Sequence, residues 1–518
     1  MRRVLTCAAL ALVAWTAVTL PSADASAFCG FYVAGGGARL FNDATQAVMM
    51  RQGTRTVLSI QNSYKGPPRD FAMVVPVPQV LHKENVKTLP KDVFDKIDRL
   101  SAPRLVEYWE QDPCYQPEYK EEEAAVQYGA GPTGGAVKGA VKVEAKFSVG
   151  EYDVVVLSAE ESTALDTWLH QNHYQIPDGA EPYFRPYVEG GSFFFVAKVN
   201  AKKVKYEDGR AVLSPLRFAY DTDKFQLPIR LGMINSSGKQ DLIVYILASQ
   251  RYELANYPNV TIPTNIEVQN SVRDRFPEFY TALFDRTLEK NTADKPPVVT
   301  EYAWSAGSCD PCPGPTLDRG DYLTFGADTL EQQPGAWVLT RLHARYGRDD
   351  VGEDLVFKAA NGIVGGRQGT GNGAKTSAQN NFQGRYIIRH EWKGKVECDD
   401  PQYGIWGGPP DGNGSTMAGA AASANTRAKA PITKKSPVDL AKSVAQAVPA
   451  LGIDAPPSPE KGKAHRPSPK RGETTEHLSK SCKGCATSPS GSSGLWLLLV
   501  GLFVVGRRFF SLGEDTTT

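Results

Sequence analysis

The stretch Val48-Met49-Met50-Arg51-Gln52-Gly53-Thr54-Arg55-Thr56-Val57-Leu58-Ser59-Ile60 indicates the fold class. Its two halves, 48–51 and 55–60, are rich in apolar and β-branched residues, and they flank the turn residues Gln52-Gly53-Thr54. Strand-forming runs on either side of a short glycine-containing turn are the pattern of a β-hairpin. We therefore expect two antiparallel strands at this point of the chain.

Runs of strand length recur on both sides of this hairpin. Four are continuously apolar and two alternate as half-buried strands do: Phe71–Val75, Val154–Leu157, Phe193–Val199, Leu242–Leu247, Trp337–His343 and Tyr386–Trp392. No repeat of roughly 20–50 residues accompanies them. We expect an α+β, β-rich domain over 28–410, with antiparallel and mixed sheets, a few inserted helices and a sub-boundary near 260–272.

Three helical regions are expected between the strands. Ser158 followed by Glu161 forms a capping box before a helix that carries Leu165, Trp168 and Leu169. Another helical region lies within 90–110 and is interrupted by Pro103. The remaining helical region begins at Asp274. Its apolar residues follow at gaps of three and four, which places them on one helical face: Phe276, Phe279, Tyr280, Leu283, Phe284 and Leu288.

Residues 1–27 are typical of a secretory signal peptide. Arg2 and Arg3 precede an apolar stretch that ends at Leu20, and Ala25-Ser26-Ala27 offers small residues for cleavage between Ala27 and Phe28. A lipoprotein signal that uses Cys29 is disfavoured, because Ser26-Ala27-Phe28 lacks the expected leucine and small residue. We expect export by the general route.

The other end of the chain is typical of an anchor. A hydrophobic helix is expected at 494–506, and Arg507 and Arg508 follow it directly. With the uncharged residues before it, this segment reaches the roughly 17–25 residues that a bilayer span needs. The arginine pair would keep the C-terminus on the cytoplasmic side and the body outside. We assign 482–508 as a sorting or anchor segment and 509–518 as a short tail.

A stalk is expected between the body and the anchor. No Phe, Tyr or Trp occurs between Trp406 and Trp496, although the chain has 21 Phe, 21 Tyr and 8 Trp. Residues 411–481 are rich in Ala, Ser, Pro, Lys and Gly, a composition that cannot bury enough apolar surface to offset chain entropy. We therefore expect a disordered tether between body and membrane.

The charge distribution argues against nucleic acid as a partner. The net charge of the chain is +1, but residues 28–410 hold 42 basic and 48 acidic side chains. A mildly acidic body lacks the basic face that displaces counterions from a phosphate backbone. We expect no nucleic-acid ligand.

Two resemblances add to this interpretation. The junction Ser481-Cys482-Lys483-Gly484-Cys485, the small residues after it, the apolar helix and the Arg pair together resemble the myxobacterial C-terminal sorting tail called MYXO-CTERM. The resemblance implies that a membrane protease cuts near Cys482 or Cys485 and that the product is displayed at the cell surface. Because residues 509–518 continue past the point where such tails usually stop, a plain membrane anchor is the alternative.

The body resembles the bacterial family filed as domain of unknown function 2330. The resemblance lies in four stretches of 28–410: Phe28-Cys-Gly-Phe-Tyr-Val-Ala34, Phe71-Ala-Met-Val-Val-Pro-Val-Pro78, Ser101-Ala-Pro-Arg-Leu-Val-Glu-Tyr108 and Leu227-Pro-Ile-Arg-Leu-Gly-Met233. It implies an exported bacterial protein and assigns no activity, ligand or catalytic residue.

Five cysteines lie in the body: Cys29, Cys114, Cys309, Cys312 and Cys398. Export makes disulfides the expected state, and a Cys29–Cys114 bond would staple the N-terminus. Cys309-Asp310-Pro311-Cys312 has the C-x-x-C spacing of redox motifs. Its surroundings, rich in Gly, Pro and Ser, indicate a long loop rather than a strand-to-helix turn. Structural disulfides are favoured there over a redox pair or a metal site.

Four other motifs were weighed as sites, and a structural role is favoured for each. They are the H-x-x-H pair His170 and His173 with Asp166 one turn back, the core-strand histidine His390 before Glu391, the P-loop-like segment Gly369–Thr376, and the acidic group Asp349, Asp350, Glu353 and Asp354. Each lacks a part of the site it resembles. The H-x-x-H pair lacks further zinc ligands, and His390 lacks the second histidine of a zinc-protease helix. The P-loop-like segment lacks the glycine before its lysine, and the acidic group lacks the EF-hand spacing. We expect no metal and no cofactor.

The sequence thus favours a non-enzymatic module at the cell surface. Its membrane contact would be the C-terminal helix, a protease would process it, and an envelope protein or carbohydrate would be its ligand. Two alternatives remain. One is a thiol–disulfide oxidoreductase that uses Cys309 and Cys312, and the other is an extracytoplasmic hydrolase whose catalytic residues the sequence does not reveal.

Overall fold

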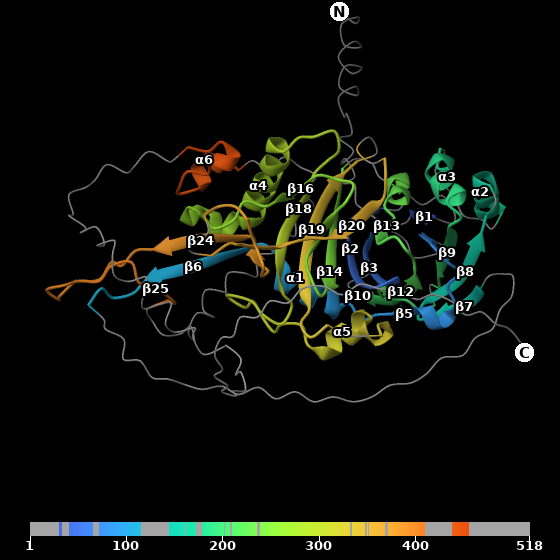
Figure 1. Ribbon diagram of the computed structural model, residues 1–518, viewed down its shortest axis with the longest axis horizontal. Coiled ribbons are helices and arrows are strands. Elements are labelled where there is room, and N and C mark those ends of the chain that lie inside the picture. Colours follow the sequence, from blue (N-terminus) through green and yellow to red (C-terminus); the bar gives the residue numbers. More distant parts are fainter. Residues whose placement is uncertain are drawn as a thin grey trace, which may run out of the picture. The chain divides into compact units, whose positions relative to one another are not determined.

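The computed structural model describes residues 31–33, 41–65, 72–114, 145–159, 161–171, 179–200, 202–207, 210–235, 239–331, 334–347, 350, 352–367, 371–409 and 438–454. All of them lie in one compact unit, Met1–Gly462. Figure 1 shows the arrangement of its elements.

The expected hairpin is confirmed. Strands β2 (Phe41–Gln52) and β3 (Arg55–Lys65) pair antiparallel, with Gln52 opposite Arg55. Gly53 in the turn has φ +56°, a left-handed conformation that glycine adopts without the steric cost of a side chain.

This hairpin lies within an eleven-stranded sheet. Ten strands follow the order β22-β21-β23-β18-β19-β14-β2-β3-β12-β5, and β16 pairs with β18. The sheet is mixed, because β14–β2, β16–β18 and β21–β23 are parallel pairs and the others are antiparallel. The bounds of the other strands are β22 (Lys375–Ser377), β21 (Gly362–Gly365), β23 (Asn381–Gln383), β18 (Val298–Ser305), β19 (Val338–Tyr346), β14 (Gln240–Ala248), β12 (Leu216–Asp221), β5 (Val86–Thr88) and β16 (Asn259–Thr261).

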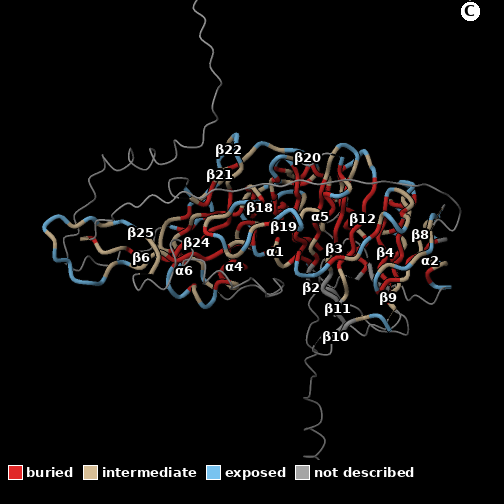
Figure 2. Tube along the Cα trace, turned by 90° about the horizontal axis from the view of Figure 1, so that it is seen from below, coloured by how far each residue is buried: buried red, intermediate tan, exposed pale blue. Residues whose placement is uncertain are grey.

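A second, antiparallel sheet packs on one face of the large sheet. Its five strands are β1 (Phe31–Val33), β4 (Ala72–Val77), β9 (Phe193–Val199), β8 (Tyr152–Ser158) and β7 (Ala145–Val149), in that order. Met49, Leu58 and Val244 of the large sheet share one buried core with Val75 and Phe195 of the smaller sheet. Figure 2 shows the buried strands of this layer.

Helices cover the outer faces of both sheets. Helices α1 (Asp92–Ser101) and α5 (Arg319–Phe325) pack on the other face of the large sheet, where Phe94 and Phe325 meet edge to face. Helices α2 (Ser162–Gln171) and α3 (Glu181–Glu189) cover the smaller sheet. Because both faces of the central strands are covered, strands such as β4 and β14 are buried along their whole length.

Several smaller elements complete this part of the unit. They are the pair β10 (Lys205–Glu207) and β11 (Arg210–Val212), the three-stranded sheet β13 (Gln226–Leu227), β20 (Leu355–Ala359) and β15 (Tyr252–Leu254), and the 3₁₀ turns η1 (Lys83–Asn85), η2 (Arg230–Asn235), η3 (Asn270–Arg275), η4 (Ala327–Thr329) and η6 (Pro449–Leu451).

A four-stranded sheet extends away from the large sheet (Figures 1 and 2). Its order is β17 (Ile266–Glu267), β24 (Arg385–His390), β6 (Arg104–Glu110) and β25 (Trp406–Gly407). Helix α4 (Phe276–Lys290) packs on its inner part. The apolar face predicted for this helix is confirmed: Phe276, Phe279, Tyr280, Leu283 and Phe284 are buried.

Three sequence-based expectations about element boundaries are wrong. Helix α1 ends at Ser101, and the residues after Pro103 form strand β6, because proline disfavours a helical residue before it. Ser158 belongs to strand β8, and the next helix begins only at Ser162, so Ser158 and Glu161 do not cap it. Strand β24 ends at His390, two residues earlier than expected.

The expected stalk is also corrected, because residues 438–454 pack against the body. Helix α6 (Leu440–Ser443) and η6 contribute Val444, Val448 and Leu451 to the core that includes α4. The Gln269 N–H donates to the Ser443 carbonyl at 2.8 Å, so the segment also continues a backbone hydrogen-bond ladder. An aromatic-poor segment cannot form a core of its own, but a few aliphatic residues suffice to cover an existing apolar surface.

Among the described residues, no helix combines the length and the apolar character that a bilayer crossing requires. Several predictions lie outside the described residues and stay predictions. They concern the signal peptide, the remainder of the stalk, the sorting segment 482–508 with its helix, the tail 509–518, and the residues Ala27, Phe28, Cys29, His173, Asp349, Gly369, Thr370, Cys482 and Cys485.

Candidate functional site

The outer part of the four-stranded sheet forms what we call the arm: strands β6, β24 and β25 with the loops 111–114 and 391–405. Strands β6 and β24 lie far apart in the sequence but pair in parallel, with Trp109 opposite His390. A disulfide between Cys114 and Cys398 joins the two loops across a sequence separation of 284 residues. The arm is therefore braced covalently at its outer end.

An aromatic and charged group occupies one face of the arm. The rings of Trp109 and His390 stack with their centroids 4.8 Å apart and their planes at 19°. The His390 Nε2 atom lies 2.7 Å from Glu107 Oε2, and Arg273 Nε donates to Glu107 Oε1 at 2.9 Å. Burial alone would raise the pKa of Glu107, but the hydrogen bonds from Arg273 and His390 outweigh it and lower the pKa. Glu107 is thus held as a carboxylate that fixes the His390 ring.

The loop after β24 is positioned by a buried carboxylate on the opposite face. Glu110 accepts hydrogen bonds from the backbone N–H groups of Trp392 at 3.0 Å and Gly404 at 2.9 Å. The Trp392 indole lies directly over Gly394, where a Cβ atom would come within 2.4 Å of the ring atom Cζ2. A residue without a side chain is therefore required at 394 for this position of Trp392.

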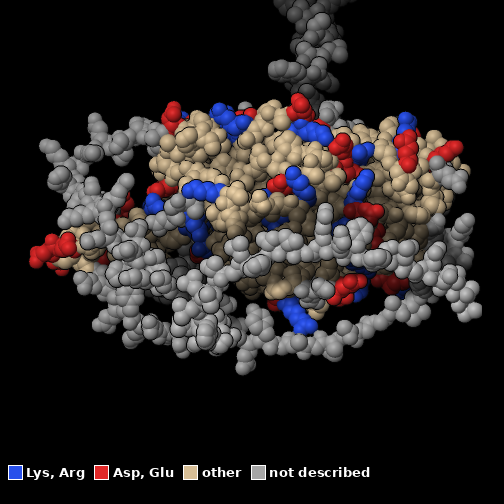
Figure 3. Space-filling model, viewed as in Figure 1, with Lys and Arg blue, Asp and Glu red and all other residues tan. Residues whose placement is uncertain are grey.

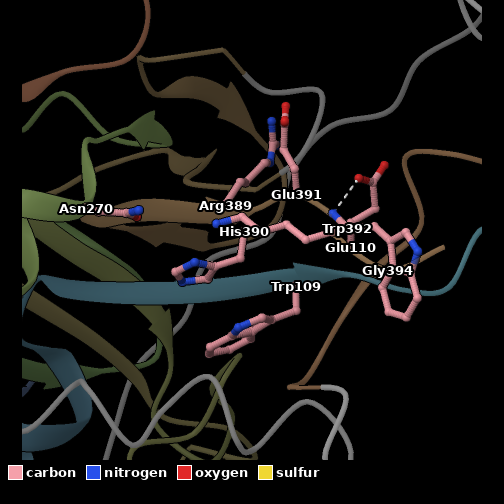
Figure 4. Close-up of a pocket in the computed structure, with 9 residues that line it drawn as sticks. Trp109, Glu110, Asn270, Arg389, His390, Glu391, Trp392 and Gly394 are labelled. Carbon is pink, nitrogen blue, oxygen red and sulfur yellow. Dashed lines mark hydrogen bonds between the residues drawn. The ribbon is translucent and has the colours of Figure 1, made fainter. Parts of the chain in front are cut away.

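A cavity of about 520 Å³ opens between these groups. Figure 4 shows Trp109 and His390 on one side of it and Trp392 with Gly394 farther along the arm. Its lining is formed by Trp109, Glu110, Asn270, Arg389, His390, Glu391, Trp392, Lys393 and Gly394. Two indoles, an imidazole, two cationic groups, two carboxylates and an amide thus share one open site.

Charges around the cavity are unevenly distributed. Arg389 stacks on Trp406 at 5.2 Å from the ring centroid and pairs with Glu267 at 2.9 Å. Acidic side chains gather at the outer end of the arm (Figure 3), where Glu397, Asp399 and Asp400 are exposed in the loop. The cavity therefore holds both signs of charge, and a further acidic group lies beyond it at the outer end of the arm.

The side chains that line the cavity include no Ser, Thr, Tyr or Cys, and its two carboxylates belong to Glu110 and Glu391. Within the described residues, no three His, Cys, Asp or Glu side chains are grouped so that they could hold a metal ion. The donors, acceptors and ring faces of the cavity are suited to holding a polar ligand that has a flat apolar face.

The structure pairs four of the five predicted body cysteines. Cys114 bonds to Cys398 and not to Cys29, which corrects the expected N-terminal staple. Cys309 bonds to Cys312 within the loop between β18 and α5, in agreement with the loop that the Gly, Pro and Ser residues predict.

The histidine motifs give two outcomes. His170 is exposed at the end of α2 and pairs with Asp166 of the preceding turn at 3.4 Å. His390 is not a core residue, which corrects the sequence-based expectation, because its side chain is 20% exposed and its ring faces the cavity. The apolar residues on its strand, Tyr386 and Ile388, are buried as expected, but the strand leaves the core before it reaches His390.

The acidic residues after Asp349 do not converge on a cation. Asp350 pairs with Lys239 at 3.4 Å, and Glu353 pairs with Lys295 at 2.8 Å. Asp354 is turned inward and accepts a hydrogen bond from the Tyr187 hydroxyl at 2.6 Å. Of the P-loop-like segment, Asn372 and Gly373 form a bend and Lys375 begins strand β22, so no helix follows.

Sequence reasoning did not single out Trp109, Glu107 or Arg273 as site residues. A signal was present: Glu107 and Glu110 interrupt the otherwise apolar and aromatic strand 104–110. A carboxylate in such a strand must find a partner when it is buried. The partners come from η3 and β24, which are distant in sequence.

The structure contains a second charged group that no sequence motif indicates. We call it the buried charge network: Asp98, Asp241, Asp285, Glu301, Arg341, His343 and Arg345. Arg341, His343 and Arg345 alternate along β19 and therefore project from one face of the strand. Their carboxylate partners come from four different elements, so no local pattern predicts the pairing.

Histidine 343 lies at the centre of this network. Its Nδ1 atom is 2.7 Å from Glu301 Oε1, and its Nε2 atom is 3.0 Å from Asp241 Oδ1. Burial would lower the pKa of His343, but the two carboxylates outweigh it and raise the pKa. His343 is thus stabilised as a buried imidazolium that bridges the two acids.

Fold and site together define a β-rich α+β protein with a disulfide-braced arm that carries an open aromatic and charged cavity. Residues 23–358 match the family described as an uncharacterized protein conserved in bacteria, DUF2330. The chain belongs to this family. The match includes β6 and ends before β24, so one strand of the arm lies within it and the other beyond it. No curated protein and no solved structure matches the chain significantly.

Proposed function

We propose that the chain is an exported, surface-anchored binding module whose arm cavity binds carbohydrate of the cell envelope. The observation that supports this most is the lining of the cavity, which combines two indoles with charged and amide side chains. A sugar ring has an apolar C–H face that an indole can cover, and its hydroxyls need donors and acceptors.

The positions of the polar groups support this ligand over an apolar one. Arg389, Lys393 and Asn270 can donate to ring hydroxyls, and Glu391 can accept from them. Trp109 and Trp392 are both half-buried, so part of each ring is accessible. The Glu107 and Glu110 contacts hold the two sides of the cavity in place before any ligand binds, which reduces the entropy cost of binding.

A panel of neutral, amino and uronic-acid oligosaccharides, titrated against the full chain and followed by tryptophan fluorescence, tests this proposal. We expect Trp392→Ala and Lys393→Ala to weaken binding roughly tenfold or more, because losing one good contact costs about 1.4 kcal/mol. Lys395→Ala is the matched control, since Lys395 lies on the same loop and does not line the cavity. If Lys393→Ala and Lys395→Ala bind oligosaccharide with equal affinity, the binding site lies outside this cavity. If the chain binds an envelope protein and no oligosaccharide, the proposal of a carbohydrate ligand is wrong.

Export and anchoring are supported by the sequence of the two ends. We infer cleavage between Ala27 and Phe28, display of the body on the extracytoplasmic side, and either processing near Cys482 or Cys485 or retention of an intact helix at 494–506. Mass spectrometry of the native protein identifies both termini. A mature N-terminus at Phe28 is the expected result, and an intact N-terminus at Met1 would contradict export. A C-terminus near Cys482 supports the sorting signal, whereas an intact Thr518 supports the plain anchor.

A further inference from the structure

The disulfide between Cys309 and Cys312 lies at the surface, in the loop between β18 and α5. Cys312 is exposed, whereas Cys309 is half-buried and packs beside the apolar residues that α1 and α5 cover. One sulfur of the pair is therefore accessible to a reagent, and the other is shielded by the body.

The two disulfides of the described residues differ in what they can contribute to stability. In the chain-entropy account, a disulfide stabilises the folded state more when it closes a longer loop. Cys114 and Cys398 are 284 residues apart, whereas Cys309 and Cys312 are three residues apart. The Cys114–Cys398 bond thus suits a structural staple, and the Cys309–Cys312 bond contributes little by the same mechanism.

The loop is held by contacts that do not involve sulfur. Arg104 Nη1 donates to the Pro311 carbonyl at 2.7 Å, and Asp310 pairs with Arg367 at 3.0 Å. The Tyr302 hydroxyl also donates to the Ser308 carbonyl at 3.3 Å. Because these contacts hold the residue before Cys309 and both residues between the cysteines, the loop keeps its anchoring when the sulfur–sulfur bond opens.

Two guanidinium groups accompany this loop. Arg104 is buried, and burial lowers its pKa to about 10, so that it remains a cation at neutral pH. Arg367 lies over the Trp304 ring at 4.6 Å from the centroid and reaches the loop at Asp310. Both guanidinium groups thus contact the two residues between the cysteines, Pro311 and Asp310.

We propose that Cys309–Cys312 is a redox-active disulfide that exchanges two electrons with a dithiol of another molecule. This activity is independent of the carbohydrate cavity. A thiolate of the dithiol attacks Cys312 Sγ, the bond to Cys309 breaks, and Cys309 leaves as a thiolate. The second thiolate of the dithiol then attacks the partner's first sulfur, which is bonded to Cys312 in the mixed disulfide. The bond to Cys312 breaks, and Cys312 leaves as a thiolate. The partner is oxidised to a disulfide, the pair is reduced, and the two thiol protons of the partner pass to Cys309 and Cys312.

Equilibration of the full chain in reduced and oxidised glutathione buffers tests the proposal. Free thiols are then alkylated, and the cysteine peptides are resolved by mass spectrometry. We expect Cys309–Cys312 to open reversibly at glutathione ratios at which Cys114–Cys398 stays oxidised, with an unchanged near-ultraviolet circular dichroism spectrum. Opening of both disulfides together, or only with loss of that spectrum, would show that the pair is structural.

Single substitutions provide a second, independent readout. Cys309→Ser leaves the exposed Cys312, whose thiolate should attack a peptide disulfide, form a mixed disulfide with one peptide sulfur and release the other as a thiolate. Cys312→Ser leaves only the shielded Cys309 and should trap less mixed disulfide by roughly tenfold or more, because exchange depends on access to the sulfur. Equal trapping by the two variants would overturn the assignment of Cys312 as the attacked atom. A normal near-ultraviolet spectrum of each variant shows that it is folded.

Discussion

Replacing His343 with glutamine should destabilise the fold by removing a cation from between two buried acids. The imidazolium of His343 contacts Glu301 at 2.7 Å and Asp241 at 3.0 Å, and all three side chains are at most 10% exposed. Glutamine can hydrogen-bond to a carboxylate but carries no charge. In the variant, Glu301 keeps Arg341 at 2.6 Å, and Asp241 keeps Arg345 at 2.8 Å, as the remaining cations.

The size of the effect follows from Glu301. Burial raises the pKa of this carboxyl, but His343 and Arg341 outweigh it and lower the pKa from 4.5 to about 2. Such a shift corresponds to about 3 kcal/mol of stability at neutral pH. Breaking a buried ion pair by removing one partner typically costs about 3–5 kcal/mol. His343 accounts for only part of that shift, because Arg341 contributes to it as well. Because both acids keep an arginine, we expect the free energy of unfolding to fall by about 3 kcal/mol, the lower end of the range for a broken buried pair.

The pH dependence has a definite sign for each group. The pKa of Glu301 is lowered by folding, so its contribution is present above pH 4.5 and is lost as the pH falls toward 2. The pKa of His343 is raised above 6.5, so its contribution is complete below pH 6.5 and is lost as the pH rises through the folded-state value. In the wild type, the free energy of unfolding should therefore fall at alkaline pH as His343 loses its proton. The variant should lack this part of the fall.

Urea unfolding followed by far-ultraviolet circular dichroism from pH 3 to about pH 9 measures both effects, since the slope in urea reports the surface exposed. His170→Gln is the control, because His170 pairs with Asp166 at the exposed end of α2 and exposed pairs contribute about 0–1 kcal/mol. A loss of less than about 1 kcal/mol in His343→Gln, or an unchanged alkaline decline, would refute the charged bridge.

Three further predictions concern the arm and the C-terminal segment. Substituting Cys114 and Cys398 by serine should lower the free energy of urea unfolding by about 3–5 kcal/mol, and a loss below about 1 kcal/mol would contradict their role as a staple. Gly394→Ala should displace the indole of Trp392 and weaken oligosaccharide binding in the fluorescence titration, while the urea midpoint stays nearly unchanged. Val448→Asp should expose residues 438–454 to amide hydrogen exchange, because it buries an unpaired carboxylate; protection equal to that of the wild type would contradict the packing of this segment.

The fold class was predictable because its signal is local. Hairpin β2–β3, strand β9 and the apolar face of α4 each arise from the spacing of apolar residues within one short segment. The errors occur where a local pattern competes with tertiary contact. Residues 104–110 are a strand because β24 and β25 pair with them, and residues 438–454 are ordered because α4 offers them an apolar surface.

The candidate site was only partly predictable. The cysteines and their loop were recognised, because cysteine is rare and its spacing is informative. The partner of Cys114 was assigned wrongly, since connectivity depends on which loops meet in space. His390 was expected in the core because its strand is apolar as far as Ile388, and nothing local shows that the strand continues beyond the core.

By itself, the sequence determined the β-rich class, the hairpin, the main helix and the family resemblance, since each depends on residues that are neighbours along the chain. Only the tertiary structure decided the arm cavity, the Cys114–Cys398 staple and the buried charge network. In the network, acids from α1, β14, α4 and β18 meet the cations of β19. A buried charge must be paired, but the identity of its partner is set by packing between elements that are distant in sequence.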